Sequence, residues 1–123
     1  MHNHAEIPVT ATLYGIPACD TVRKARAWLD AQGVPYRFHD YKKEGVDPAM
    51  LGRAVAHLGW EKVLNRQGTT FRKLPEAERA ELDQDRAMAI MQANPSAIKR
   101  PLLEHGDVIE AGFSPDRYAQ LFD

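Results

Sequence analysis

A strand, a helix and a second strand follow one another near the start of this chain, and this order constrains the fold more than any other feature. Val9 to Tyr14 alternates threonine with apolar residues, which predicts a strand. From Cys19 to Gln32 apolar residues recur at three- and four-residue spacing, which predicts an amphipathic helix that Gly33 ends. A second strand is predicted from Tyr36 to Tyr41. A crossover of this length is typical of parallel strand pairing.

Helices are predicted through the middle of the chain. Asp47 and Pro48 have the residue types of an N-cap and a first helical position, and Gly59 ends the apolar stripe that follows them. The next elements are predicted to be a short helical turn, a polar loop and two amphipathic helices, at Trp60–Leu64, Asn65–Thr70, Pro75–Leu82 and Asp85–Ala93.

The C-terminal part predicts a β-hairpin and a closing helix. Apolar runs around Leu102 and Val108 flank the turn residues His105-Gly106-Asp107. Ser114, Pro115 and Asp116 have the residue types of an N-cap, a first helical position and an acidic first turn, and they predict a helix through Phe122. The order βαβ, helices, ββα is that of a thioredoxin-like α/β fold with a mixed central sheet. We expect a disordered leader over 1–8 and a single domain over 9–123, with a helical insertion at about 47–94.

Composition and charge argue against several classes of protein. The 123 residues carry 16 basic and 17 acidic side chains, so net charge gives no reason to expect binding to nucleic acid or a membrane. No apolar run approaches the roughly 18 residues of a membrane span, and no signal-peptide h-region is present. We therefore expect a cytoplasmic monomer. A single cysteine excludes an internal disulfide and a multi-thiolate zinc site, and we expect no bound metal or cofactor.

Cys19 is the residue at which chemistry is predicted. It follows the first strand, lies between Pro17 and the predicted helix, and so faces unpaired backbone N–H groups and the positive end of the helix dipole. Both favour the thiolate, which is the nucleophile. Arg23 adds a positive charge one turn later, whereas Asp20 raises a thiol pKa. The alternative is a cysteine that packs as a small apolar residue.

Two arginines in separate loops are candidates for anion binding. Arg66 lies in the polar loop, and Arg100 precedes Pro101, a proline that holds it extended and is a candidate for a cis peptide bond. If both loops converge on Cys19, the arginines form a cationic pocket for an anionic substrate group. The alternative for each arginine is a solvated surface position. The three histidines outside the leader are expected to be structural or exposed: His39, His57 and His105.

An ordered set of short motifs extends from about residue 11 to 122. They are Leu13-Tyr14-Gly15-Ile16, Cys19-Asp20-Thr21, Lys24-Ala25, Phe38-His39-Asp40-Tyr41, Leu64-Asn65-Arg66, Gly68-Thr69-Thr70, Arg72-Lys73-Leu74, Ile98-Lys99-Arg100-Pro101-Leu102-Leu103 and Gly112-Phe113-Ser114. Together they resemble the arsenate reductase (ArsC)-like family of thioredoxin-fold proteins, which also includes the Spx regulators, and specifically its YffB branch.

The resemblance implies a nucleophilic cysteine after the first strand and a proline, typically cis, that faces it at position 101. In arsenate reductases of this type the cysteine attacks arsenate, glutathione resolves the adduct and arginines hold the oxyanion. Cys19, Arg66 and Arg100 match the cysteine and two of those arginines.

The chain departs from the family patterns at three places. Gly15 stands where arsenate reductases carry a histidine, and Val22 stands where they carry a serine before the arginine. The segment Glu110–Phe113 lacks the third arginine that holds the oxyanion. Val22 also replaces the second cysteine of the Cys-x-x-Cys switch that Spx regulators carry. A lone cysteine needs a second thiol from elsewhere, and cytosolic glutathione is abundant.

These residues predict a thiol-dependent oxidoreductase, a glutathione-dependent thiol/disulfide reductase with Cys19 as its single nucleophile. Its substrate or glutathione would contact Thr21, Arg23, Arg66, Arg100 and Pro101. The expected partners are glutathione, as co-substrate, or a small anionic or thiol substrate, with glutaredoxin as a further partner. The alternatives are an arsenate reductase that uses glutathione and glutaredoxin, and an Spx-like regulator that binds RNA polymerase.

Overall fold

The computed structural model describes residues 11–122, so the predicted leader, with Val9 and Thr10, lies outside the described part of the chain. The predicted strand, helix and strand are confirmed as β1 (Ala11–Gly15), α1 (Asp20–Ala31) and β2 (Tyr36–Asp40). Helix α1 buries its apolar face, because Val22, Ala25 and Leu29 are inaccessible to solvent.

Helical segments occupy the chain between β2 and the C-terminal hairpin. They are α2 (Tyr41–Glu44), α3 (Pro48–Leu58), α4 (Trp60–Val63), α5 (Thr69–Arg72), α6 (Glu76–Arg79), α7 (Gln84–Ala93) and the 3-10 helix η2 (Pro95–Ala97). The predicted cap of α3 is present, because the Asp47 carboxylate accepts the Ala49 N–H at 3.0 Å. Among the described residues, no helix is long and apolar enough to cross a membrane.

A four-stranded mixed sheet forms the centre of the molecule, in the order β2-β1-β3-β4. β1 and β2 are parallel, whereas β3 (Leu102–His105) runs antiparallel to β1 and pairs with β4 (Val108–Ala111) in the predicted hairpin. Helix α8 (Pro115–Leu121) follows, with the Ser114 hydroxyl accepting the Arg117 N–H at 3.0 Å as its cap. This βαβ and ββα arrangement is a thioredoxin-like fold.

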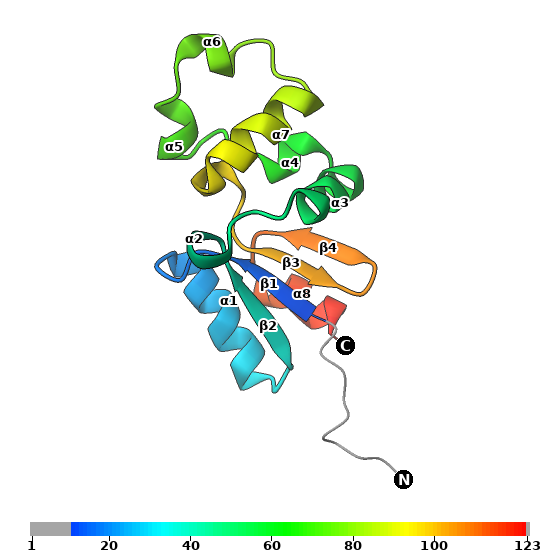
Figure 1. Ribbon diagram of the computed structural model, residues 1–123. Coiled ribbons are helices and arrows are strands. Elements are labelled where there is room, and N and C mark those ends of the chain that lie inside the picture. The colour runs from blue at the N-terminus through cyan, green and yellow to red at the C-terminus, as the bar shows by residue number, and fades with distance from the viewer. Residues whose placement is uncertain (1–10, 123) are drawn as a thin grey trace.

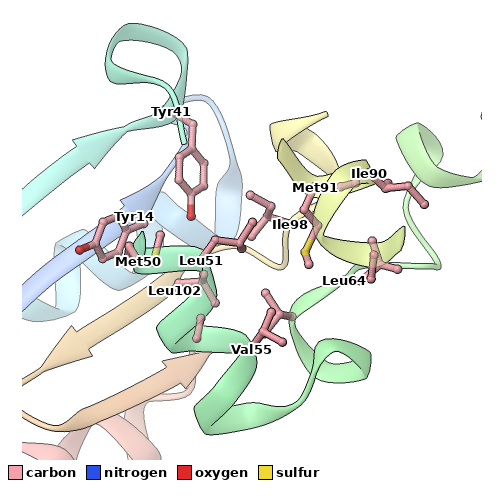
Figure 2. Packing of buried hydrophobic residues seen from close by; sticks show 14 of the residues in the cluster. Tyr14, Tyr41, Met50, Leu51, Val55, Leu64, Ile90, Met91, Ile98 and Leu102 are labelled. Carbon is pink, nitrogen blue, oxygen red and sulfur yellow. The ribbon is translucent and has the colours of Figure 1, made fainter. Parts of the chain in front are cut away.

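Two layers of helix cover the two faces of the sheet (Figure 1). Leu13 and Leu103 face α1 and α8 and belong to one apolar cluster, which includes the fully buried Tyr118. Tyr14 and Leu102 point the opposite way, into a larger cluster with α3 and α7, part of which Figure 2 shows. Neighbouring residues of a strand point to opposite faces, so β1 and β3 contribute to both clusters.

Three sequence predictions in the middle of the chain were wrong in extent. The second strand ends at Asp40, because the Asp40 carboxylate accepts the Lys42 N–H at 2.9 Å and begins α2 at Tyr41. The predicted polar loop ends early, because Phe71 is buried and anchors α5 from Thr69 onward. The predicted 75–82 helix is only α6, which buries no residue and is followed by Glu81 with a φ of 52°.

Candidate active site at the C-terminal edge of the central strands

Four segments meet at one edge of the sheet. β1 and β2 end there together, because Gly15 pairs with Asp40. β3 begins there and β4 ends there, because Leu102 pairs with Tyr14 on one side and with Ala111 on the other. The loop after β1 carries Cys19, and the segment before β3 carries Arg100, so the strand order brings two residues distant in sequence to the same edge.

Cys19 is the N-cap residue of α1 and is partly exposed. Its backbone is extended, with φ −77° and ψ 128°, and its carbonyl accepts the Arg23 N–H at 2.9 Å. Its own N–H donates to the Ile16 carbonyl at 3.1 Å, which closes the turn between strand and helix. The side chain is therefore held where the first N–H groups of α1 have no partner within the helix.

The surroundings of the sulfur lower the Cys19 pKa below its ordinary value. Burial raises this pKa, but hydrogen bonds from the Val22 N–H, the Arg100 side chain and the Thr21 N–H, with the positive charge of Arg100, outweigh burial. The stabilised form is the thiolate. A partly exposed thiolate at a helix N-terminus is suited to nucleophilic attack on sulfur.

Arg100 is held in place by its own backbone and by the segment before it. The Arg100–Pro101 peptide bond is cis and Pro101 is fully buried. The Pro101 carbonyl accepts the Gly112 N–H at 2.8 Å, which ties this segment to the end of β4. The Nη1 of Arg100 donates to the Ser96 carbonyl at 3.0 Å. Thus Arg100 and Pro101, both predicted site residues, lie at the edge that carries Cys19.

Thr21 and Arg23 contribute to this edge in different ways. Thr21 acts on the sulfur through its backbone N–H. The guanidinium of Arg23 donates to the Ala18 carbonyl at 3.0 Å and pairs with the Asp20 carboxylate. Arg23 thereby braces the Cys19 loop and balances the charge of Asp20, the residue expected to oppose thiolate formation.

Arg66 lies in the predicted polar loop, and its side chain lines a groove. Its guanidinium is 5.6 Å from the centre of the Trp60 ring, and it lines a cavity of about 440 Å³ together with Lys62, Lys99 and Glu110. The backbone joins this groove to the Cys19 edge, because the segment before Arg66 pairs with the segment before Arg100: Asn65 N–H donates to the Ala97 carbonyl at 2.8 Å. Cys19 does not line the groove.

Two of the positions that depart from arsenate reductases, Gly15 and Val22, are packed against each other. A Cβ atom at Gly15 would lie 2.7 Å from a side-chain methyl of Val22, so the glycine leaves room for the buried valine. In the segment 110–113, which lacks the third arginine, Glu110 accepts a hydrogen bond from Arg117 at 3.0 Å and lines the Arg66 groove. The site therefore lacks the histidine, the serine and one cation of the arsenate reductase pattern.

One residue of this edge was missed as a candidate from the sequence. Tyr41 was placed in the second strand, but it begins α2 and its hydroxyl is buried among the residues shown in Figure 2.

The histidines lie elsewhere: His39 contacts the Gly45 carbonyl at 2.7 Å and His57 is exposed on α3. Within residues 11–122, no three acidic, cysteine or histidine side chains are placed to hold a metal ion.

A thioredoxin-like fold with a single cysteine at the N-terminus of its first helix, and a cis-proline directly before β3, identifies the chain as a thioredoxin-like protein with one candidate thiol site. The sequence model of the ArsC family matches residues 14–121. The chain belongs to the ArsC family.

Three similar proteins place the chain within this family. A solved structure of a YffB protein is 57% identical, with a TM-score of 0.88 over 90% of this chain and 97% of that one. An arsenate reductase (ArsC) related protein from Brucella melitensis is 49% identical, with a TM-score of 0.73 over 94% and 96% of the two chains. The global transcriptional regulator Spx of Listeria innocua is 27% identical over 85% of this chain and 81% of its own length. The resemblance to the YffB branch is confirmed.

Proposed function

We propose that this protein is a glutathione-dependent thiol/disulfide reductase with Cys19 as its nucleophile. The observation that carries the proposal is the position of Cys19 as the N-cap residue of α1, where the Val22 and Thr21 N–H groups and the Arg100 guanidinium favour the thiolate. No second cysteine exists in the chain, so the resolving thiol comes from another molecule. Glutathione is the abundant thiol of this kind in the cytosol.

The proposed reaction balances with two molecules of glutathione. The Cys19 thiolate attacks one sulfur of a substrate disulfide, forms a mixed disulfide with it and releases the other half as a thiolate, which takes up a proton. A glutathione thiolate then attacks the mixed disulfide and restores Cys19. A second glutathione reduces the substrate–glutathione disulfide, so one disulfide is reduced to two thiols and two glutathione molecules are oxidised to one glutathione disulfide.

The groove that Arg66 lines supports binding of a small zwitterion. Lys62, Arg66 and Lys99 supply cations, and Glu61 and Glu110 supply carboxylates, along the wall of the same cavity. Glutathione carries two carboxylates and one ammonium group, so it matches both signs of charge. In this proposal Arg100, Pro101 and Thr21 lie at the reacting sulfur, Arg66 holds a carboxylate, and Arg23 keeps Asp20 from opposing the thiolate.

The pH dependence of Cys19 alkylation tests the first step. The rate of modification by iodoacetamide, measured by mass spectrometry across the pH range, is expected to give a Cys19 pKa below the ordinary value of about 8.5. Incubation with oxidised glutathione is expected to add one glutathionyl group at Cys19, and reduced glutathione is expected to remove it. An ordinary pKa together with no adduct would contradict the proposal.

Arg66 provides a separate test of binding. Arg66→Gln is expected to weaken glutathione binding, seen as a KM for glutathione raised several-fold, because one charged hydrogen bond to a carboxylate is lost. The pKa of Cys19 is expected to stay unchanged, since Arg66 contacts Trp60 and lines the groove without contacting the sulfur. Arg72→Gln, another exposed arginine of the same helical region, is the matched control.

Arsenate reduction is tested by the same protein. Millimolar arsenate with glutathione and glutaredoxin is expected to give no turnover above background, because the segment Glu110–Phe113 lacks the third arginine for the oxyanion. Arsenate-dependent oxidation of glutathione that Cys19→Ser abolishes would instead assign the arsenate reductase activity.

The similarity to Spx favours a second candidate, an adaptor that binds a transcription partner such as RNA polymerase. An adaptor of this kind needs no reactive thiol. Pull-down of purified polymerase with the wild-type protein and with Cys19→Ser discriminates the two functions. Equal retention of polymerase by both would favour the adaptor, and no retention would leave the reductase as the function.

A further inference from the structure

Two buried side-chain polar atoms, from residues that border this end of the sheet, have no hydrogen-bond partner within the described residues. They are the hydroxyl oxygen of Tyr41 and the Nε of Arg100. Most buried polar groups in folded proteins are hydrogen-bonded, and an unpaired one lowers stability by about 1–3 kcal/mol. Such a pair of atoms at a reactive site therefore needs a physical explanation.

Tyr41 and Arg100 come to the same edge of the sheet from different strands. Tyr41 directly follows Asp40, the last residue of β2, and is only 2% exposed. Figure 2 shows its side chain pointing inward among the buried residues, in the region of Leu51, whereas the Tyr14 hydroxyl turns away from them. Arg100 is two residues before β3, which starts at that edge.

The charge of Arg100 acts on Tyr41. Burial raises the pKa of the Tyr41 phenol well above its ordinary value, Tyr14 adds to this rise, and the positive charge of Arg100 opposes it. The same guanidinium also lowers the pKa of Cys19. Arg100 thus lies where it influences both the thiol and the phenol.

The two unpaired atoms are complementary as donor and acceptor. The Nε–H of an arginine only donates, and a phenol oxygen has lone pairs that accept. The other known contacts of Arg100 are its Nη1 hydrogen bond to Ser96 and its interaction with the Cys19 sulfur. The two atoms are not in direct hydrogen-bond contact, so a single bridging water would satisfy both and fix the plane of the guanidinium.

We propose that Tyr41 is a positioning residue of the Cys19 site, whose hydroxyl receives the Nε–H of Arg100 through one bridging water and so holds the guanidinium in place near the sulfur. This inference rests on the proposed reductase function, because it assigns Tyr41 a role in keeping the thiolate reactive. Tyr41 does not touch the reacting atoms and acts only through Arg100.

Replacement of the phenol by a phenyl ring tests this role with little change in shape. Tyr41→Phe is expected to raise the Cys19 pKa by about half a unit, and so to slow alkylation about threefold below the pKa. The measurement is the pH profile of iodoacetamide modification, with the free energy of unfolding in urea measured in parallel. Tyr36→Phe is the matched control, because Tyr36 lies on β2, the strand that precedes Tyr41, and its hydroxyl accepts a hydrogen bond from Arg26 at 3.1 Å.

If Tyr41 only fills the core, Tyr41→Phe is expected to leave the Cys19 pKa unchanged and not to lower the free energy of unfolding. Removal of a buried hydroxyl that has no partner increases the free energy of unfolding and leaves the thiol unaffected. An unchanged Cys19 pKa in Tyr41→Phe, with stability equal to or above that of the wild type, would therefore overturn the proposal.

Two further variants separate this inference from the proposed function. In an Arg100→Gln background, Tyr41→Phe is expected to have no additional effect on the Cys19 pKa, since both changes act through one guanidinium; an additive effect would overturn the inference. Arg100→Lys keeps the charge but removes the Nε–H, and is expected to raise the Cys19 pKa as Tyr41→Phe does. This variant provides the test if Tyr41→Phe does not fold. An unchanged Cys19 pKa in Arg100→Lys would overturn the inference.

The wild-type and Arg100→Gln proteins show which proposal fails. If the wild-type pKa is low and Arg100→Gln raises it while Tyr41→Phe does not, only the role of Tyr41 is wrong. If the wild-type pKa is ordinary and no glutathione adduct forms, both proposals fail.

Discussion

Two polar clusters built on the central sheet differ in how their hydrogen bonds are satisfied. On the face beneath α3, the Glu104 carboxylate accepts from the Tyr14 hydroxyl at 3.0 Å, from Arg53 Nε at 2.8 Å and from Arg53 Nη2 at 3.1 Å. At the C-terminal edge, Cys19 and Arg100 interact, but the Arg100 Nε and the Tyr41 hydroxyl have no partner among the described residues.

The difference separates a structural cluster from a reactive one. The Glu104 cluster joins α3 to β1 and β3, and its bonds lower the pKa of Glu104 and help to raise that of Tyr14 to about 12, so both groups keep one charge state near neutral pH. The Cys19 cluster instead favours the charged form of its thiol, which under the proposed function is a nucleophile that loses its charge during reaction. Satisfied networks stabilise a fold, whereas unsatisfied polar groups are concentrated where a site acts.

Cys19→Ser is expected to have the largest effect. It should abolish formation of the glutathione adduct completely, because no other thiol exists in the chain. Intact-mass spectrometry after incubation with oxidised glutathione measures this. The free energy of unfolding should change by less than about 1 kcal/mol, since the side chain is partly exposed and nearly the same size. An adduct on the serine variant would mean that the reactive group is not Cys19.

Arg100→Gln is expected to raise the Cys19 pKa by about one unit and to slow alkylation about tenfold below the pKa, because a charged donor to the thiolate is replaced by a neutral one. The pH profile of alkylation measures the shift.

The Cys19 pKa is lower in the folded protein than in the unfolded chain. The Cys19 thiolate therefore contributes stability above the ordinary pKa of about 8.5, and this contribution is lost as the pH falls through the folded-state pKa.

The exposed neighbour Lys99 is the control for this charge change. Lys99→Gln removes the same charge one residue away and should leave the Cys19 pKa within about 0.3 units, since exposed charges are screened by solvent. Equal shifts in both variants would mean that overall charge, and not the contact with the sulfur, controls the thiol.

Glu104→Gln is expected to act on stability without acting on the thiol. The free energy of unfolding at neutral pH should fall by about 1–2 kcal/mol, because the carboxylate accepts from both Arg53 and Tyr14. Urea unfolding measures this fall, and the Cys19 alkylation profile should not move. A shift of the Cys19 pKa would show that the two clusters are coupled and would remove the distinction between them.

The pH dependence of this effect follows from the Glu104 pKa. Arg53 holds that pKa below its ordinary range, so the stabilisation is complete above the ordinary value of about 4.3 and is lost as the pH falls through the folded-state value. The difference in unfolding free energy between the wild type and Glu104→Gln should therefore shrink in acid. A difference that stays constant down to pH values below the folded pKa would contradict the ionic origin of the effect.

Arg23→Gln is expected to have the smallest effect. Its guanidinium pairs with Asp20, so its charge is balanced, and both side chains are largely exposed. The Cys19 pKa should rise by less than about half a unit, and Asp20→Asn in the same protein should reverse the rise. The alkylation profile measures both changes. A rise as large as that of Arg100→Gln would place Arg23 at the sulfur itself.

Much of the fold was predictable because its signals are local. The helix caps at Asp47 and Ser114 form as their residue types indicated, and the hairpin turns at Gly106 as expected. Tyr41 shows the limit of such signals, because strand alternation continued through it while the Asp40 side chain had already begun a helix. Phe71 shows the same limit, since one buried aromatic ring anchors a helical turn within a polar segment.

Residues within one turn of Cys19 were enough to predict its position, because Cys19 follows a strand, precedes a helix and so occupies an N-cap. The surroundings of Cys19 depend instead on the order of the strands. Pairing of β1 with both β2 and β3 brings Arg100 to the end of the sheet that carries Cys19, leaves Arg66 in a separate groove and joins Tyr14 to Glu104, which is 90 residues away. The reason is that capping and periodicity act over a few residues, whereas contacts across a sheet depend on strand order and on which side chains share a face.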